Sequence, residues 1–116
     1  MHKEFVTPDP QDIVNALGVE AEITGDTQRT LKLSDVTGED LTFSFDSVGQ
    51  SVSVSWCTSS GRNILKLFRE GATLLRIVEE GGETQLLTEF ETQDTTGELR
   101  VCIFPEVSIT DKSLFS

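Results

Sequence analysis

Residues 41–56, LTFSFDSVGQSVSVSW, alternate apolar and polar side chains on both sides of the turn "SVGQ". The apolar positions share one parity within each half of the stretch: Leu41, Phe43 and Phe45, then Val52, Val54 and Trp56. Successive side chains of a β-strand point to opposite faces of a sheet, so each half collects its apolar residues on one face. The stretch therefore predicts two antiparallel strands that share a buried face.

The segments "VEAEI" and "RTLKLS", which begin at Val19 and Arg29, continue the alternation upstream. Their apolar sets meet if Ala21 lies opposite Leu31, and Ile23 is then expected to face inward as well. Together with residues 41–56, these segments predict four consecutive strands in a meander.

A second meander is predicted from "TLLRIVEE", "TQLLTEFE" and "ELRVCIF". Glycine pairs favour tight hairpins, and a turn at Gly81 and Gly82 places Ile77 opposite Leu86 and Leu75 opposite Thr88. The next hairpin, through "QDTTG", is expected to pair Phe90 with Val101 and to bring Glu91 opposite Arg100. A last edge strand is predicted within "FPEVSIT", and residues 111–116 are expected to be a loose end.

Two helices are predicted beside these strands. The first covers about residues 9–17, where Asp9 can cap the helix, Pro10 suits its first position and Gly18 suits its end. The second covers about residues 63–70, between the two meander halves, where the apolar residues fit a helical face better than strict alternation. The alternative is a strand that pairs with residues 52–56 through a turn at Ser60 and Gly61. We favour the helix, because a tight hairpin at Glu70 and Gly71 would turn the next strand's apolar residues outward.

The fold class that follows is α+β, mainly an antiparallel β-meander of about seven to eight strands with these two helices. A chain of 116 residues has the size of a single domain, which we assign to residues 1–116. The chain has no run of 18 apolar residues, and its N-terminus lacks the apolar segment of a secretory signal. We therefore expect a cytoplasmic location.

The formal net charge is −11. Such a surface repels nucleic acid and anionic membranes, and it favours cationic partners. Negative charge also raises solubility, which is the plainer explanation of this composition. The charge alone therefore excludes two classes of ligand without identifying a third.

The sequence offers no catalytic constellation, no metal site and no cofactor motif. Its one histidine, His2, lies beside the N-terminus, so a Ser-His-Asp triad or a His-based metal site would depend on a terminal residue. The two cysteines, Cys57 and Cys102, are expected to be reduced thiols. An enzyme that uses carboxylates alone stays open, because any two of the 20 acids could meet in the fold.

Charge is unevenly distributed along the chain. The window from Ser47 to Arg69 contains three bases and no acid, whereas the window from Ile77 to Leu99 contains seven acids and no base. The seven acids are the candidate partner-binding residues: Glu79, Glu80, Glu83, Glu89, Glu91, Asp94 and Glu98. These charges either pair across strands on a solvated face, for example with Arg76 and Arg100, or attract a cationic partner.

These features predict a non-catalytic protein-binding module. Its concrete form is an inhibitor or immunity-type protein that neutralises a basic toxin, such as a nuclease, with carboxylates where phosphates would bind. The alternative is a carrier of small apolar ligands, in which the two helices cover a concave sheet around Trp56 and Phe45. The sequence does not indicate an oligomeric state.

Overall fold

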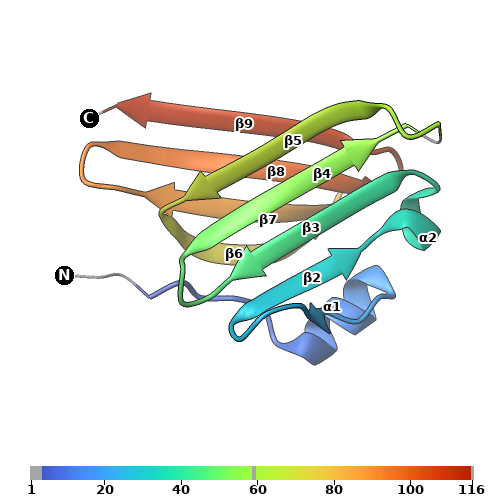
Figure 1. The fold of residues 1–116 in the computed structure, drawn as a ribbon, viewed down its shortest axis with the longest axis horizontal. Helices are drawn as coiled ribbons and strands as arrows, with labels where there is room; N and C mark the ends of the chain where they lie inside the picture. The colour runs from blue at the N-terminus through green and yellow to red at the C-terminus, as the bar shows by residue number, and fades with distance from the viewer. Residues whose placement is uncertain (1–3, 59, 116) are drawn as a thin grey trace.

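Two antiparallel sheets face each other in the computed structural model, which describes residues 4–58 and 60–115 (Figure 1). In this described part, the first sheet has the strand order β1-β2-β3-β4-β5 and the second has the order β6-β7-β8-β9. The first sheet contains β1 (Glu22–Ile23), β2 (Gln28–Lys32), β3 (Asp40–Asp46), β4 (Ser51–Cys57) and β5 (Asn63–Glu70). The second contains β6 (Ala72–Glu80), β7 (Glu83–Glu91), β8 (Thr95–Phe104) and β9 (Ser108–Phe115). With the helices α1 (Pro10–Leu17) and α2 (Ser34–Thr37), the predicted α+β class is confirmed.

The hydrophobic core lies between the two sheets, because alternate residues of each strand point inward. The parity that residues 41–56 predict is confirmed, since Leu41 and Phe43 are fully buried and Val54 is 2% exposed. Trp56 is only partly buried, and its indole N–H donates to Glu39 Oε1 at 3.0 Å. The inward residues of the second sheet complete the core: Leu75, Leu86, Leu99 and Val101.

Helix α1 closes one side of the core, and its predicted signals are all used. Asp9 accepts a hydrogen bond from the backbone N–H of Gln11 at 3.0 Å, and Pro10 is the first helical residue. Gly18 has φ +74, the left-handed conformation that ends many helices. Ile13 and Leu17 are buried in the core, so the helix packs one apolar face inward.

The first hairpin has the predicted register but a shorter strand. Glu22 lies opposite Thr30 and Ile23 opposite Arg29, the same register that pairs Ala21 with Leu31. Ile23, opposite Arg29, has the expected inward parity, but its side chain is 74% exposed rather than packed in the core. β1 is the outermost strand of its sheet and pairs through two residues only. Helix α2, which follows β2, was not predicted.

The predicted helix at residues 63–70 is wrong, and this segment is β5. It pairs with β4 in the register of the alternative, with Trp56 opposite Leu65 and Val54 opposite Leu67. A turn joins the two strands, in which the Thr58 N–H donates to the Arg62 carbonyl at 2.8 Å. Asn63 is the first residue of the strand.

The prediction of a helix assumed that a strand at residues 63–70 would have to join the next strand by a tight hairpin at Glu70 and Gly71. After β5 the chain crosses to the second sheet, so β5 and β6 do not form a hairpin. Gly71 makes the crossing with φ +90, and a Cβ there would lie 2.7 Å from Thr92 Cγ2. An irregularity in the pairing between Ala72 and Leu74 then resets the alternation, so that Ala72 and Leu75 are both buried.

Two expectations for the second sheet need correction. The pairs Ile77–Leu86 and Leu75–Thr88 are confirmed, but Phe90 lies opposite Gly97 rather than Val101. Similarly, Glu91 lies opposite Thr96, and Arg100 lies opposite Leu87. The turn is shorter than predicted, because Thr95 already belongs to β8.

The C-terminal segment, expected to be loose from residue 111, continues β9 through Phe115. It pairs with β8 along its whole length, from Cys102 opposite Ser108 to Thr95 opposite Phe115. Ser116 lies outside the described residues. Eight ordered residues therefore replace the short edge strand and loose end that the sequence predicted.

Candidate interaction surface

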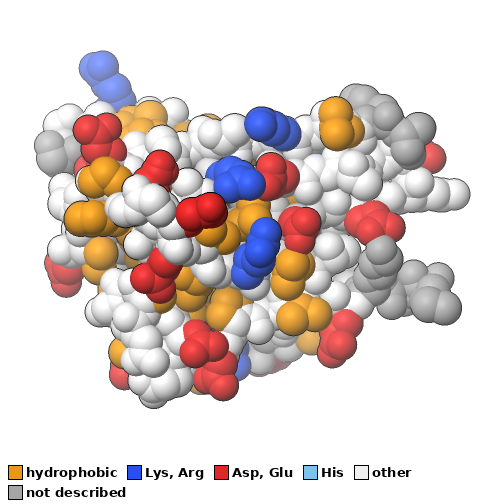
Figure 2. All heavy atoms as spheres, turned by 180° about the vertical axis from the view of Figure 1, so that it is seen from behind, with side chains coloured by type: hydrophobic (Ala, Val, Ile, Leu, Met, Phe, Trp, Pro, Cys, Tyr) orange, Lys and Arg blue, Asp and Glu red, His pale blue; other side chains and the backbone are white. Residues whose placement is uncertain are grey.

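The outer face of the second sheet carries most of the acids predicted to bind a partner. Glu80, Glu83, Glu89, Glu91 and Glu98 share its outward parity, as the strand registers show. Figure 2 views the molecule from this side, where red acidic side chains surround a few blue basic ones in the middle of the face. The sheet thus brings acids from three strands onto one surface.

These acids form two groups rather than one patch. Glu79, Glu80 and Glu83 lie at the β6–β7 turn, where Glu80 is directly opposite Glu83. The second group, Glu89, Glu91, Asp94 and Glu98, lies along β7, β8 and the turn that joins them. The strand β7 separates the two turns by about 25–30 Å, given a rise of about 3.3 Å per residue.

The acids pair internally to a limited extent. Glu98 Oε1 lies 2.8 Å from Arg100 Nη2, and Arg100 also donates to Gln85 Oε1 at 3.1 Å. Glu89 lies directly opposite Glu98, a placement that is unfavourable for two like charges. Glu91 and Asp94 have interactions of their own. The predicted pairing of Glu91 with Arg100 is absent from the observed register.

Two arginines cover an apolar residue on this face. Arg76 and Arg100 lie opposite Leu87 on either side, and Leu87 is 1% exposed although it points away from the core. Long basic side chains commonly pack their alkyl stems over apolar neighbours while the charge stays in water. The predicted pairing of Ile77 with Leu86 already places Arg76 opposite Leu87, whereas Arg100 comes opposite Leu87 only in the observed register of β7 and β8.

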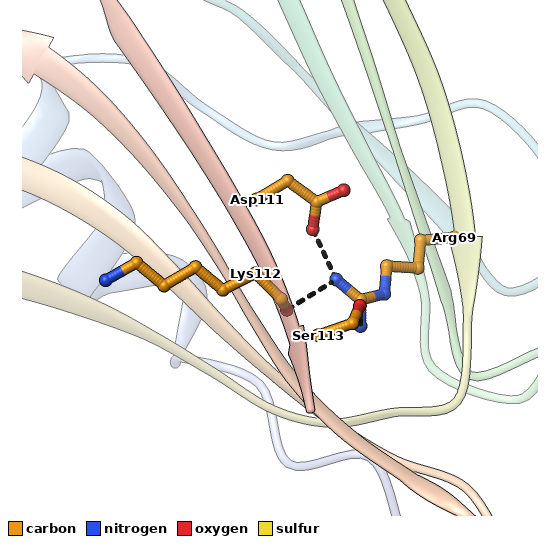
Figure 3. Close-up of polar contacts among 4 residues, drawn as sticks. All are labelled: Arg69, Asp111, Lys112 and Ser113. Carbon is orange, nitrogen blue, oxygen red and sulfur yellow. Dashed lines mark hydrogen bonds and ion pairs between the residues drawn. The ribbon is translucent and has the colours of Figure 1, made fainter. Parts of the chain in front are cut away.

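One base of the basic window, Arg69, lies between the two sheets. Arg69 points inward from β5 and joins the edges of the two sheets, where it forms an ion pair with Asp111 of β9 (Figure 3). It also donates to the Lys112 carbonyl at 3.2 Å and to Ser113 Oγ at 2.7 Å. Its guanidinium carbon lies 4.2 Å from the centre of the Phe90 ring, a cation–π contact. This basic residue thus has a structural role.

A groove between α1 and β6 is the feature that the sequence analysis missed. It has a volume of about 520 Å³, and it is lined by Val6–Pro8, by Asp12, Asn15 and Ala16 of α1, and by Leu74–Ile77 and Glu79 of β6. We call it the α1–β6 groove. Of the seven predicted acids, Glu79 lines it, together with Asp12 from the helix. These residues are far apart in the sequence, so no local pattern could have joined them.

A second hollow of about 870 Å³ lies beside the other acidic group, lined by Glu89, Glu91, Glu98, Asp111 and Lys112 among others. Within the described residues, no group of three or more His, Cys, Asp or Glu side chains is arranged to hold a metal ion. Both hollows are open depressions of the surface.

The two thiols and the carboxyl of Asp46 form local hydrogen bonds. Cys57 and Cys102 are free thiols, and each donates locally, to Asn63 Oδ1 at 3.1 Å and to the Phe104 carbonyl at 3.3 Å. The backbone N–H of Gly49 and the hydroxyl of Thr27 donate to Asp46 and lower the pKa of that carboxyl. Among the described residues, no helix is long and apolar enough to span a membrane.

Comparison with known proteins gives one informative likeness. Neither a protein-family model nor a curated protein sequence matches this chain. Among solved structures, it is similar to a chain of the contact-dependent growth inhibition toxin–immunity protein complex from Klebsiella pneumoniae 342. The two chains share a fold. The TM-score is 0.83 at 16% sequence identity, and the alignment covers 97% of this chain and 100% of that chain.

Proposed function

We propose that this chain is an immunity-type protein, which binds a toxin and neutralises it. The observation that carries the proposal is the shared fold, which extends over almost the whole of both chains. That complex pairs a toxin with its immunity protein, which supports toxin binding as the function of this chain. Binding between two proteins of this kind is also what the sequence predicts.

Charge favours the immunity side of such a pair. The chain carries −11 and has an isoelectric point of about 4.3, and acids from three strands share one sheet face. An inhibitor gains from a strong field of one sign, because complementary charge raises association rates by about 10- to 1,000-fold at low ionic strength. A cationic toxin is the partner that this field would attract fastest.

The alternative function, a carrier of small apolar ligands, depended on a second helix that the structure does not contain at residues 63–70. It needed residues 63–70 as a helical cover over the sheet, and this segment is a strand of the sheet itself. Phe45, expected to line the ligand cavity, is 5% exposed and packs in the core. We therefore keep the protein-binding proposal alone.

Capture of the partner and a growth assay test the proposal together. The tagged chain is incubated with lysate of its source organism at low and at high salt, and cationic proteins released by salt are identified. Each is then expressed in a bacterial host, with and without this chain. We expect one captured protein to stop growth alone and to be harmless in the presence of this chain.

Two results would overturn the proposal. Either no cationic protein is retained even at low salt, where electrostatic attraction is least screened, or the retained proteins stop growth equally with and without this chain. The role of charge is tested with a variant that carries Glu80→Gln, Glu83→Gln, Glu89→Gln and Glu98→Gln. This variant keeps the size of each side chain but removes four negative charges, so it should protect less well at equal expression.

A further inference from the structure

Strand β6 is the edge of the second sheet, and its first half is covered by the chain's own N-terminal segment. Val6 lies beside Leu74 in a parallel bridge. The Val6 N–H donates to the Thr73 carbonyl at 3.0 Å, and the Leu75 N–H donates to the Val6 carbonyl at 2.8 Å. Phe5, next to this bridge, is 4% exposed and anchors the segment in the core.

Proline 8 ends this pairing. If the added strand continued, residue 8 would donate its N–H to the Leu75 carbonyl, but proline has no N–H. The chain instead turns away into α1, which begins at Pro10. The second half of β6, from Ile77 to Glu80, is therefore left without a strand on its outer side.

The open half of β6 has backbone groups ready for a further strand. Alternate residues of a strand direct both their N–H and C=O to the same neighbour. Leu75 directs its N–H to Val6, so Ile77 and Glu79, which share its parity, direct theirs to the open side. No hydrogen bond to either of these groups comes from outside the sheet in the described residues. They face the α1–β6 groove.

The groove adds side-chain features that select a ligand. Val6, which is 53% exposed, and the half-buried Ala16 and Ile77 supply an apolar wall. Asp12 and Glu79, both exposed, line the groove from its opposite sides, one on α1 and one on β6, so that with Arg76 the charged lining is two acids and one base. Ile77 and Glu79 lie on the same face of β6, so an extended segment that carries an apolar and a basic side chain two residues apart matches both features.

We propose that the α1–β6 groove is a docking site for an extended cationic segment of the protein partner, which adds a strand to the open half of β6. This inference rests on the proposed function and specifies where the partner is held. Backbone hydrogen bonds to Ile77 and Glu79 supply part of the affinity, and the two carboxylates select basic side chains.

The other long edge strands suit such a segment less well. β5 carries Lys66 and follows Arg62 of the turn, and its one acid, Glu70, lies at its end, so its exposed charge does not favour a cationic strand. β9 carries Lys112, and its acid, Asp111, is already paired with Arg69. The charge of the open half of β6 thus distinguishes it from both.

The probe for this site is the peptide acetyl-Lys-Lys-Val-Val-Lys-Lys-amide, which alternates lysine and valine on either face of an extended strand and is added to the ¹⁵N-labelled chain. Since short added strands bind weakly, it is titrated to about 2 mM. We expect the amide signals of Ile77 and Glu79 to shift most and their hydrogen exchange to slow. A peptide with N-methylated valines, which keeps charge and side chains but loses N–H donors, should shift them far less. The same holds for a peptide with Glu in place of Lys.

Variants of the chain localise the binding. The double variant Asp12→Asn with Glu79→Gln should weaken the binding of the lysine peptide about fivefold, which corresponds to about 0.5 kcal/mol for each of two exposed ion pairs. The matched control, Asp26→Asn with Glu106→Gln, removes two exposed charges elsewhere and should bind nearly as the original chain does. Circular dichroism confirms that α1 is retained, because Asp12 lies in its first turn.

Three outcomes overturn the inference: no shift at the highest concentration, shifts centred on another edge, or equal binding of the N-methylated peptide. None of these bears on the proposed function, which fails only if capture and growth protection fail. Conversely, a captured toxin whose binding is unaffected by Asp12→Asn with Glu79→Gln would leave the proposed function standing and remove this site.

Discussion

Arg69 and Gly97 depend on each other at the open side of the two sheets. Gly97 lies on the inward face of β8, opposite Phe90 and Ser113. A Cβ at this position would overlap the Arg69 guanidinium and would lie 2.8 Å from the Lys112 carbonyl oxygen. The absent side chain of Gly97 is what admits the arginine that ties β5 to β9.

Gly97→Ala should therefore destabilise the protein by about 2–3 kcal/mol, because both the arginine and the β9 backbone must shift. Urea unfolding measures this change. Gly25→Ala is the matched control, since a Cβ there meets only Gln28 Cβ at 3.5 Å, and it should change stability by less than about 0.5 kcal/mol. Equal effects of the two substitutions would contradict the role assigned to Gly97.

Thr88 carries a buried hydroxyl that has no hydrogen-bond partner in the described structure. It is fully buried on the inward face of β7, between Leu75 and Leu99 on the adjacent strands. Valine has nearly the same shape without the hydroxyl, and an unsatisfied buried polar group costs about 1–3 kcal/mol. We expect Thr88→Val to stabilise the protein by about 1 kcal/mol or more in urea unfolding. A loss of stability would mean that the hydroxyl is bonded in solution.

Asp46 gives the protein a predictable response to acid. Its pKa is lowered by hydrogen bonds from the Gly49 N–H, the Thr27 hydroxyl and the Val48 N–H. A carboxyl with a lowered pKa stabilises the folded state at pH values above its unfolded pKa, near 3.9. That contribution is lost as the pH falls through the lower, folded value.

Asp46→Ala should accordingly destabilise the protein at neutral pH, and its difference from the original chain should shrink as the pH falls below about 4. Urea unfolding over a series of pH values measures both effects. Asp26→Ala, at an exposed loop position, should show no comparable trend. A difference that grows toward acid pH would give the wrong sign and exclude this account of Asp46.

At the scale of whole elements, local signals predicted most strands and one helix. The cap and stop residues of α1 and the alternation in residues 41–56 act over a few positions, so the sequence alone reveals them. The glycine pair at Gly81 and Gly82 likewise determines its own hairpin. Such features depend little on the rest of the fold.

Residues 63–70 show where this reasoning fails. Ile64, Leu65, Leu67 and Phe68 fit one face of a helix, but in the strand Ile64 and Phe68 point outward and are 47% and 65% exposed. An exposed edge strand tolerates such residues, whereas the argument from periodicity assumes that every large apolar residue is buried. The decisive fact, that the chain changes sheets at Gly71, is a tertiary feature without a local signal.

Proline substitutions in β5 test the strand and its orientation. Gly71 donates to the Gln50 carbonyl, so by alternation Leu67 directs its N–H to β4, and Lys66 directs its N–H to solvent. Leu67→Pro should cost about 3 kcal/mol or more, and Lys66→Pro about 1 kcal/mol, because edge strands tolerate proline where no ladder bond is lost. Thermal unfolding compares them. A helix at 63–70 would suffer equally from both substitutions.

For the whole molecule, the candidate site illustrates the same limit. The sequence identified seven acids by their one-sign run, and the sheet divides them between the two ends of β7. It could not identify the α1–β6 groove, since Asp12 and Glu79 approach each other only through the packing of a helix against a distant strand. A run of acids can be recognised in the sequence, but the shape of the surface that carries these acids cannot.

The net charge of −11 should make the folding of this protein and its binding to a partner respond to salt in opposite directions. Like charges repel more strongly in the compact state than in the unfolded chain, so screening stabilises the fold. We expect the midpoint of thermal unfolding to rise by about 3 °C between about 0.01 M and 0.15 M NaCl. The Glu80→Gln, Glu83→Gln variant, which removes two opposed acids, should rise less. Over the same range, association with a cationic partner should slow by about tenfold or more.

A fall of the unfolding midpoint with salt would contradict this account. It would mean that ion pairs such as Arg100–Glu98 outweigh the repulsion between acids, so that the acids stabilise the fold.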